Sequence, residues 1–418
     1  MLLVNKCTPG VHKRVTEENM RKFNKTAACG ILAAALAAGT LSGCSKAIDG
    51  TKTVATVGDE KVTLGLASYM VRDQQAQTMS YYNMLMSQYG VSGSASNVWD
   101  QKGDDGKTVG ESSKDGVMTT INQLYVLKAH AADYDITITD DEEKAIKEAA
   151  AEFIKDNDEK ILKKLAVSED DIVTYLELVT IRSKMHDPMT ADVDTEVSAN
   201  EKDQTRVTIV KVSTEGTEKD DDGNTIDLTD EEKAQKKDLA QQVLDKVKAS
   251  DDVANADMDA LAKEVDDSLS ATAPAFTTAG STDDTLDEAV QDAALELKDG
   301  EVADSVIEGD DGYYVVRLDK MLDEDATENK EKTVISERKS DLFDSTLEDW
   351  VKEEKIKVKD KVWDQITVTD SVSFVYKSAD SNDDTKSSDA QDSTEDTSSQ
   401  DNSEDTTTED TAAEDSAE

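Results

Sequence analysis

The segment Leu286–Val302 reads LDEAVQDAALELKDGEV and is followed by GYYVVRL at Gly312–Leu318. In the first segment apolar side chains recur every three to four residues up to Gly300, which predicts an amphipathic helix that ends at this glycine. The second segment is a run of aromatic and β-branched residues, which predicts a strand. A helix followed by such a strand indicates the closing half of a compact α+β unit.

The opening half of the same unit begins near residue 205. The run RVTIVKV at Arg206–Val212 is β-branched and apolar on both faces, as expected of a buried strand. A capping box at Thr229–Glu232 predicts the start of a helix, and a second, shorter helix is expected around Met258–Val265. Residues 199–322 therefore form one predicted α+β unit, with its two long strands paired in one antiparallel sheet.

Helical sequence lies on both sides of this unit. Residues 117–187 carry apolar side chains at helical spacing, and capping signals at Thr139–Glu142 and Ser168 open two of the expected helices. Because a lone amphipathic helix must bury its apolar face, we expect residues 332–368 to return to this earlier bundle. The helical domain, which begins with residues 44–198, would then be discontinuous in sequence. The later helix is predicted from the spacing of Ile335, Arg338, Leu342, Thr346 and Trp350.

The two ends of the chain differ from its middle. Basic residues after Met20, an apolar run at Ala27–Leu41 and the small residues before Cys44 make a secretory signal that is too short to span a bilayer. Residues 1–43 are interpreted as an upstream segment and signal peptide, with the start of translation left open between the first residue and Met20.

Residues 379–418 hold ten aspartates, five glutamates, one lysine and no apolar residue larger than alanine. This segment is predicted to stay disordered, as a solvated acidic tail or as an acidic ligand for a partner.

Composition excludes several classes of function. The formal net charge of −47 supplies no basic footprint, so we expect no nucleic-acid binding and no electrostatic attachment to an anionic membrane. Only three histidines occur, His12, His130 and His186, which leaves little for a histidine-based catalytic or metal site. All three cysteines lie in the first 44 residues, so the body of the protein has neither a disulfide nor a thiol nucleophile. We expect no metal and no cofactor.

In combination, the export signal, the helical domain, the inserted α+β unit and the returning helix resemble the parvulin-type foldase lipoproteins of the PrsA family, with SurA-like chaperones as more distant relatives. The segments Leu286–Val302 and Gly312–Leu318 look like the helix and the closing strand of a parvulin (PpiC or rotamase) domain. The resemblance implies an α+β protein with a discontinuous helical PrsA/SurA-like chaperone domain, an inserted parvulin-like domain of antiparallel sheet and helices, and a disordered acidic tail. It also implies that Leu41–Cys44 is a lipobox and that Cys44 becomes the lipidated first residue. A cleaved signal that ends in cysteine by chance is the alternative.

The resemblance places an active centre in the parvulin-like domain, and this chain departs from the family pattern there. The family's two histidines correspond to Thr208 on the first strand and Tyr314 on the last. Leu286 keeps an apolar residue of the proline pocket, whereas Val290 stands where the family has phenylalanine. An isomerase must lower a barrier of ~18–20 kcal/mol by holding a twisted amide in a well-formed pocket. We therefore expect weak or no isomerase activity.

The function expected from the resemblance is that of a foldase or chaperone for unfolded secreted polypeptides, held through lipid on Cys44 at the outer face of the bacterial cell membrane. Flexible thioethers suit a promiscuous surface, so client contacts are expected in a methionine- and tyrosine-rich stretch. The candidates there are Met70, Met79, Tyr82 and Met86. The same stretch also contains Tyr81, Met84 and Tyr89. Ordinary core packing is the other explanation of this stretch. The alternative function is a surface lipoprotein scaffold or ligand-binding module that keeps the parvulin-like unit only as a fold, and the oligomeric state is left open.

Overall fold

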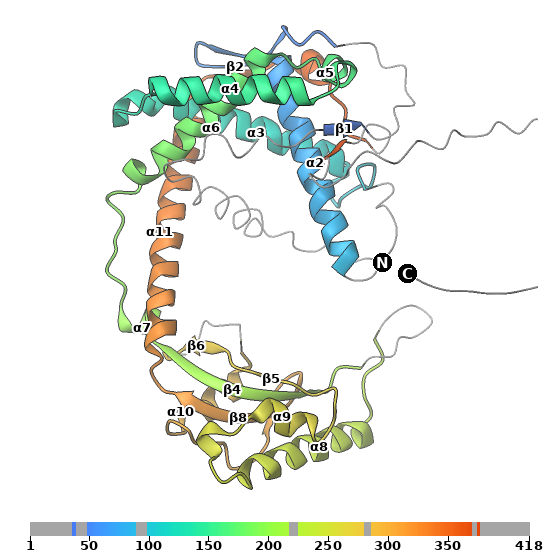
Figure 1. The fold of residues 1–418 in the computed structure, drawn as a ribbon, viewed down its shortest axis with the longest axis vertical. Helices are drawn as coiled ribbons and strands as arrows, with labels where there is room; N and C mark the ends of the chain where they lie inside the picture. The colour runs from blue at the N-terminus through green and yellow to red at the C-terminus, as the bar shows by residue number, and fades with distance from the viewer. Residues whose placement is uncertain are drawn as a thin grey trace, which may run out of the picture. The chain divides into compact units, whose positions relative to one another are not determined.

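The computed structural model describes residues 36–38, 48–88, 98–216, 225–279, 286–369 and 374–376 (Figure 1). Apart from Leu36–Ala38, the signal peptide lies outside these ranges, as do Cys44, Tyr89 and the acidic segment 379–418, so the interpretations of them stay predictions. Within the ranges given, no helix combines the length and the apolar character that crossing a membrane requires.

Helices and strands alternate unevenly along the chain. The helices are α2 (Leu64–Gln88), α3 (Val109–His130), α4 (Asp140–Asp156), α5 (Glu159–Leu165), α6 (Glu169–Met189), α7 (Ala199–Lys202), α8 (Asp230–Lys248), α9 (Met258–Lys263), α10 (Glu288–Leu295), α11 (Glu324–Glu353) and α12 (Asp360–Trp363), with short 3-10 helices at η1 (Ala131–Tyr134) and η2 (Val253–Asn255). The strands are β1 (Leu36–Ala38), β2 (Thr53–Val57), β3 (Glu60–Thr63), β4 (Gln204–Ser213), β5 (Ala271–Thr272), β6 (Ala275–Thr277), β7 (Ile307–Glu308), β8 (Gly312–Lys320), β9 (Ile356–Val358) and β10 (Phe374–Tyr376).

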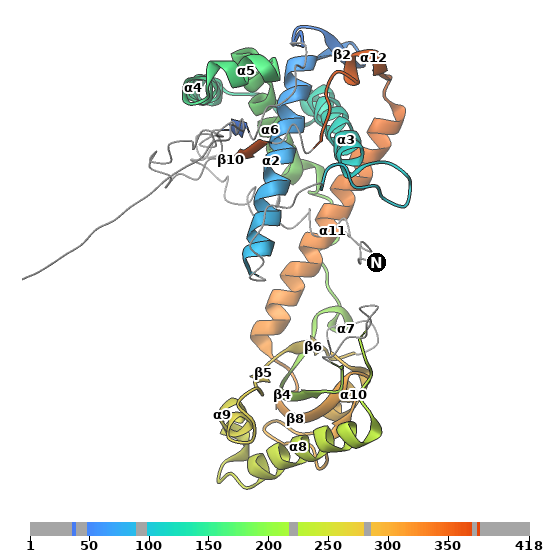
Figure 2. The same ribbon diagram turned by 90° about the vertical axis from the view of Figure 1, so that its right-hand side faces the viewer.

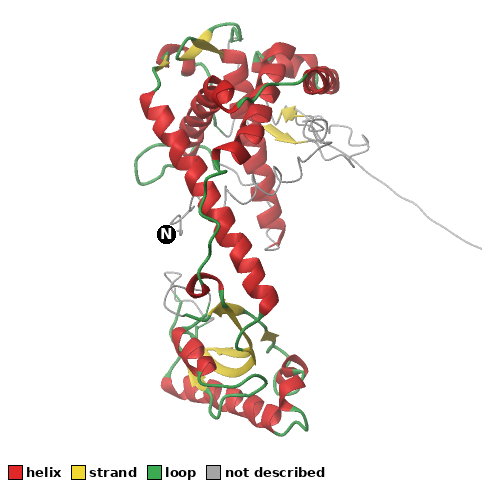
Figure 3. Cartoon of the chain, turned by 90° about the vertical axis from the view of Figure 1, so that its left-hand side faces the viewer, coloured by secondary structure: helices red, strands yellow, loops and turns green. Residues whose placement is uncertain are grey.

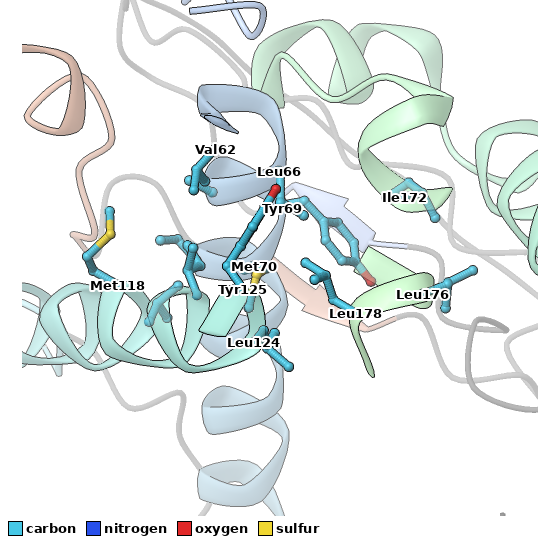
Figure 4. Packing of buried hydrophobic residues seen from close by; sticks show 14 of the residues in the cluster. Val62, Leu66, Tyr69, Met70, Met118, Leu124, Tyr125, Ile172, Leu176 and Leu178 are labelled. Atoms are coloured by element: carbon cyan, nitrogen blue, oxygen red, sulfur yellow. The ribbon is translucent and has the colours of Figure 1, made fainter. Parts of the chain in front are cut away.

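The helical domain is built from α2 to α6 around one aliphatic cluster. Helices α3, α4 and α6 each begin with a capping box, at Thr108, Thr139 and Ser168, which satisfies backbone N–H groups of the first turn. A small sheet in the order β3-β2-β9 adjoins these helices. Figure 4 shows part of the cluster, including Val62, Leu66, Tyr69, Met118, Leu124 and Ile172.

Helix α11 follows the inserted unit in sequence and packs on the helical domain, so the helical domain is discontinuous in sequence. Phe343 and Leu347 are buried in the same cluster as α3 and α6. The ring of Trp350 stacks on His130 with the two centroids 4.1 Å apart. The spacing predicted that Leu342 and Thr346 face the core, whereas the buried residues are the next ones along, Phe343 and Leu347. Phe343 provides the largest apolar side chain of this contact.

The connector that leads into the inserted unit is fastened along α11. Arg338 Nη2 lies 2.5 Å from Glu201 Oε1, and Lys202 Nζ lies 3.0 Å from Glu331 Oε1. Hydrogen bonds from Ser198 and then from the Arg338 guanidinium lower the pKa of Glu201 to about 2.

The chain enters and leaves the inserted unit through neighbouring residues. The backbone N–H of Asp323 donates to the carbonyl oxygen of Gln204 at 2.8 Å. The N–H of Gln204 in turn donates to Thr327 Oγ1 at 3.0 Å, and the guanidinium of Arg206 pairs with the Asp323 carboxylate. The start of β4 and the start of α11 are thus held together by both backbone and side-chain contacts.

The inserted unit is a sheet in the order β5-β4-β8-β7, with β6 also paired to β4. Strands β4 and β8 run antiparallel with Ile209 opposite Val316, which confirms the predicted pairing of the two long strands. Helices α8 and α9 pack on one face of the sheet and α10 packs on the other (Figures 2 and 3). The two faces therefore carry two separate apolar clusters.

We predict that Leu347→Ala destabilises the protein by about 2–5 kcal/mol, because it removes a buried side chain that α11 inserts into the helical core. A urea titration followed by circular dichroism measures the change in the free energy of unfolding. Leu322→Ala is the matched control, since this leucine is 51% exposed and its truncation should change stability by less than about 0.5 kcal/mol. Equally small effects from both substitutions would contradict the packing of α11 described above.

Candidate functional site

Three of the four predicted positions of the parvulin-like centre come together on the α10 face of the sheet. Tyr314 on β8 packs in one cluster with Leu286, just before α10, and with Val290 inside α10. All three side chains are buried, and Val290 is entirely so. Phe276 from β6 and Val207 from β4 complete the apolar surroundings.

Thr208 lies on the other face of the sheet, so the prediction that it shares a centre with Tyr314 is wrong. In the register of β4 and β8, Thr208 stands opposite Arg317. Its Oγ1 donates to Asp319 Oδ2 at 2.6 Å and accepts from Arg317 Nη2 at 3.3 Å. Because successive side chains of a strand point to opposite faces, the neighbouring residue Ile209 is the one that joins the cluster of Tyr314.

The hydroxyl of Tyr314 is already engaged. It donates to the carboxylate of Asp311, which also pairs with Lys211 Nζ at 2.5 Å. Burial, and then the hydrogen bond to Asp311, raise the pKa of Tyr314 above its ordinary value. The hydrogen bonds from Lys211 and Tyr314 lower the pKa of Asp311. Tyr314 is therefore a neutral phenol whose proton is committed to a neighbouring carboxylate, and it is not poised as an acid or a base.

A second carboxylate closes the rim of this centre. Asp287 caps α10 by accepting from the N–H of Ala289 at 2.9 Å, and its other oxygen accepts from the N–H of Asp310 at 2.7 Å. The turn before β8 is thereby held against the start of α10. At Gly309 the backbone passes so close that a Cβ atom would meet the Asp287 carboxylate and would lie 2.9 Å from Tyr314 Cε2. Sequence reasoning missed this network, although an aspartate just before a helix is a recognisable capping signal.

The chemistry open to this centre is limited by these contacts. No histidine follows His186 in the sequence, so none stands in the inserted unit. At the rim the Tyr314 phenol and the Lys211 ammonium both bond to the Asp311 carboxylate, and the Asp287 carboxylate accepts from backbone N–H groups. Among the residues that the structure describes, no group of three or more histidines, cysteines, aspartates or glutamates is placed to hold a metal ion.

The client-contact candidates on α2 divide into two groups. Met70 and Met79 are buried in the helical core, so packing explains them. Tyr82 is 39% exposed and Met86 is half-buried. The periodicity of a sequence does not show where a long helix extends beyond the core. The sequence alone therefore could not separate the buried candidates on α2 from the exposed ones.

Two further residues of the stretch are more exposed still. Tyr81 is 42% exposed and Met84 is 58% exposed. Together with Tyr82 and Met86 they form what we call the α2 surface. From Ser80 to Gln88 no residue of the helix is buried, so the last turns of α2 present large apolar side chains to solvent.

The fold and the centre define a class of protein. Residues 218–332 match the model of the PPIC-type PPIASE domain. The chain therefore carries a parvulin-type domain of the peptidyl-prolyl isomerase class, as its helix and closing strand predicted. The match begins after β4, which nevertheless pairs with β8 in the same sheet.

Solved structures similar to this chain include PrsA proteins. The foldase PrsA of Streptococcus pneumoniae is 17% identical, with a TM-score of 0.24, over 63% of this chain and 97% of that one. The peptidylprolyl isomerase PrsA of Bacillus cereus is 18% identical, with a TM-score of 0.26, over 64% and 96%. A structure from the SurA-like chaperones of Campylobacter jejuni is 15% identical, with a TM-score of 0.18, over 62% and 99%. No curated protein sequence matches the chain.

We predict that Gly309→Ala destabilises the protein by about 1–3 kcal/mol, because the added methyl group overpacks the contact between Asp287 and Tyr314. Gly116→Ala is the matched control. A Cβ atom at Gly116 meets nothing within 4 Å, and alanine within helix α3 should stabilise it by roughly 0.5–1 kcal/mol. The free energy of unfolding in urea distinguishes the two. A Gly309→Ala protein as stable as the wild type would show that the rim is looser than these distances indicate.

Proposed function

We propose that this protein is an extracytoplasmic, lipid-anchored chaperone of the foldase type, which holds unfolded secreted polypeptides and has weak or no prolyl isomerase activity. The observation that carries the proposal is the α2 surface, in a chain that also contains a parvulin-type domain. The anchor is assigned to Cys44 from the lipobox-like sequence Leu41–Cys44, and the location is the outer face of the bacterial cell membrane.

The holding function rests on exposed apolar side chains. The exposed large hydrophobic residues of the described chain are Tyr81, Tyr82, Met84, Ile226 and Leu322, and three of these five are neighbours on α2. Clusters of this kind on a soluble surface mark interaction sites more often than single exposed residues do. Methionine and tyrosine can adapt to many partners, since the thioether is flexible and polarisable and the phenol has both an apolar body and a polar end.

The weak isomerase activity rests on the state of the parvulin-like centre. Val290 stands in the place of an aromatic pocket wall, and it is fully buried in the cluster. The hydroxyl of Tyr314 is held by Asp311. A twisted prolyl amide would meet Val290 where the family has a phenylalanine, and the phenol of Tyr314 is already bonded to Asp311. The transition state would therefore gain little binding over the ground state.

The holding function predicts that the mature protein at equimolar concentration delays the aggregation of a denatured reporter, measured by light scattering. The double variant Tyr82→Asp, Met84→Asp should lose most of this effect, because two charges would occupy the apolar surface. Ile226→Asp is the matched control, since it adds a charge at an exposed apolar residue elsewhere and should leave the delay unchanged. A double variant that protects the reporter as well as the wild type would refute the assignment of this surface.

For the parvulin-like centre we predict that the wild-type protein raises the rate of cis–trans isomerisation of a proline tetrapeptide by less than about twofold. The uncatalysed reaction crosses a barrier of ~18–20 kcal/mol, and the centre should lower it very little. A protease-coupled assay measures the rate. The result that would overturn this expectation is a larger acceleration that disappears in Tyr314→Phe and persists in Thr208→Ala, which alters the opposite face of the sheet.

A further inference from the structure

The α2 surface lies within a part of the sequence that carries no charge. From Gln74 to Trp99 there is no aspartate, glutamate, lysine, arginine or histidine, although 33% of the residues in the chain are charged. The formal net charge of −47 shows how strongly this protein depends on acidic side chains elsewhere. An exposed helix end is normally rich in charged residues, since they are the residues most often found at the surface.

The structure shows that burial does not explain the missing charges. Helix α2 packs with the core as far as Met79, and Figures 1 and 2 both show it continuing past its crossing with α3. Beyond that point the solvent-facing residues between the large side chains are Ser80, Asn83, Ser87 and Gln88, which are polar and neutral. The helix end is therefore exposed, partly apolar and uncharged at the same time.

We propose that the α2 surface takes uncharged apolar polypeptide segments and rejects segments that bring a charge of either sign into contact with it. This inference rests on the proposed chaperone function and names the class of client segment. A charged side chain that is removed from water at a contact must be compensated by an opposite charge. No residue from Gln74 to Gln88 can provide that charge, whereas Tyr81, Tyr82 and Met84 provide apolar contact and Asn83 and Gln88 provide amides for a client backbone.

The test uses the full mature chain and three fluorescent peptides of one length and sequence that differ only in a central leucine, lysine or glutamate. Fluorescence anisotropy gives the dissociation constants. The leucine peptide should bind at least about tenfold more tightly than either charged peptide, a difference of about 1.4 kcal/mol. Its affinity should change less than twofold between 0.1 M and 1 M NaCl, over which the Debye length falls from ~10 Å to ~3 Å.

A charge placed on the surface should reverse the preference. Met84→Lys is expected to weaken binding of the leucine peptide and to strengthen binding of the glutamate peptide relative to the wild type. Leu322→Lys is the matched control, because it adds the same charge at an exposed apolar residue outside α2, and it should leave all three affinities unchanged.

The outcomes separate this inference from the function on which it rests. Equal affinity of the wild type for all three peptides, with loss of binding in Met84→Lys, overturns the selectivity and leaves the chaperone function standing. Binding that Met84→Lys does not alter overturns the assignment to this surface. Failure of the wild type to bind any of the peptides and to delay reporter aggregation overturns the proposed function itself.

Discussion

The antiparallel pairing of β4 with β8 is the interaction on which the rest of this architecture depends. The two strands are separated in sequence by α8, α9 and α10, so their pairing closes a long loop at an entropy cost that rises only slowly with loop length. Once paired, they bring Gln204 beside Asp323 and start α11 where the insertion began. The return of α11 to the helical core, through Phe343 and Leu347, follows from that closure.

Local signals in the sequence predicted much of this fold. The capping boxes at Thr139, Ser168 and Thr229 mark real helix starts, and each is formed by a side chain that accepts from a backbone N–H three residues on. The two long strands were recognisable because β-branched residues dominate β4 and because two tyrosines and two valines stand together in β8. These features depend on residues that are near one another in sequence, which is the reason that a sequence reveals them.

The candidate site was less predictable because it depends on contacts between distant residues. Strand β4 is apolar on both faces, so its pattern could not show that Thr208 points away from Tyr314 while Ile209 points toward it. The burial of Met70 and the exposure of Met84 likewise depend on where other helices end, and nothing in the periodicity of α2 carries that information.

The parvulin-like centre and the α2 surface differ in how far their side chains are already engaged in contacts. At the parvulin-like centre the phenol of Tyr314 and the ammonium of Lys211 both bond to the carboxylate of Asp311. On the α2 surface the side chains of Tyr81, Tyr82 and Met84 are exposed, so apolar area remains open to a partner.

The hydrogen bond between Gln204 and Asp323, which joins the entry and the exit of the inserted unit, has a consequence for how such a protein can evolve. A unit whose entry and exit are adjacent behaves as a cassette, and its interior can drift without disturbing the framework that carries it. Because a fold does not fix the function of the unit that carries it, substitutions inside the cassette can change its chemistry while the framework around it stays the same.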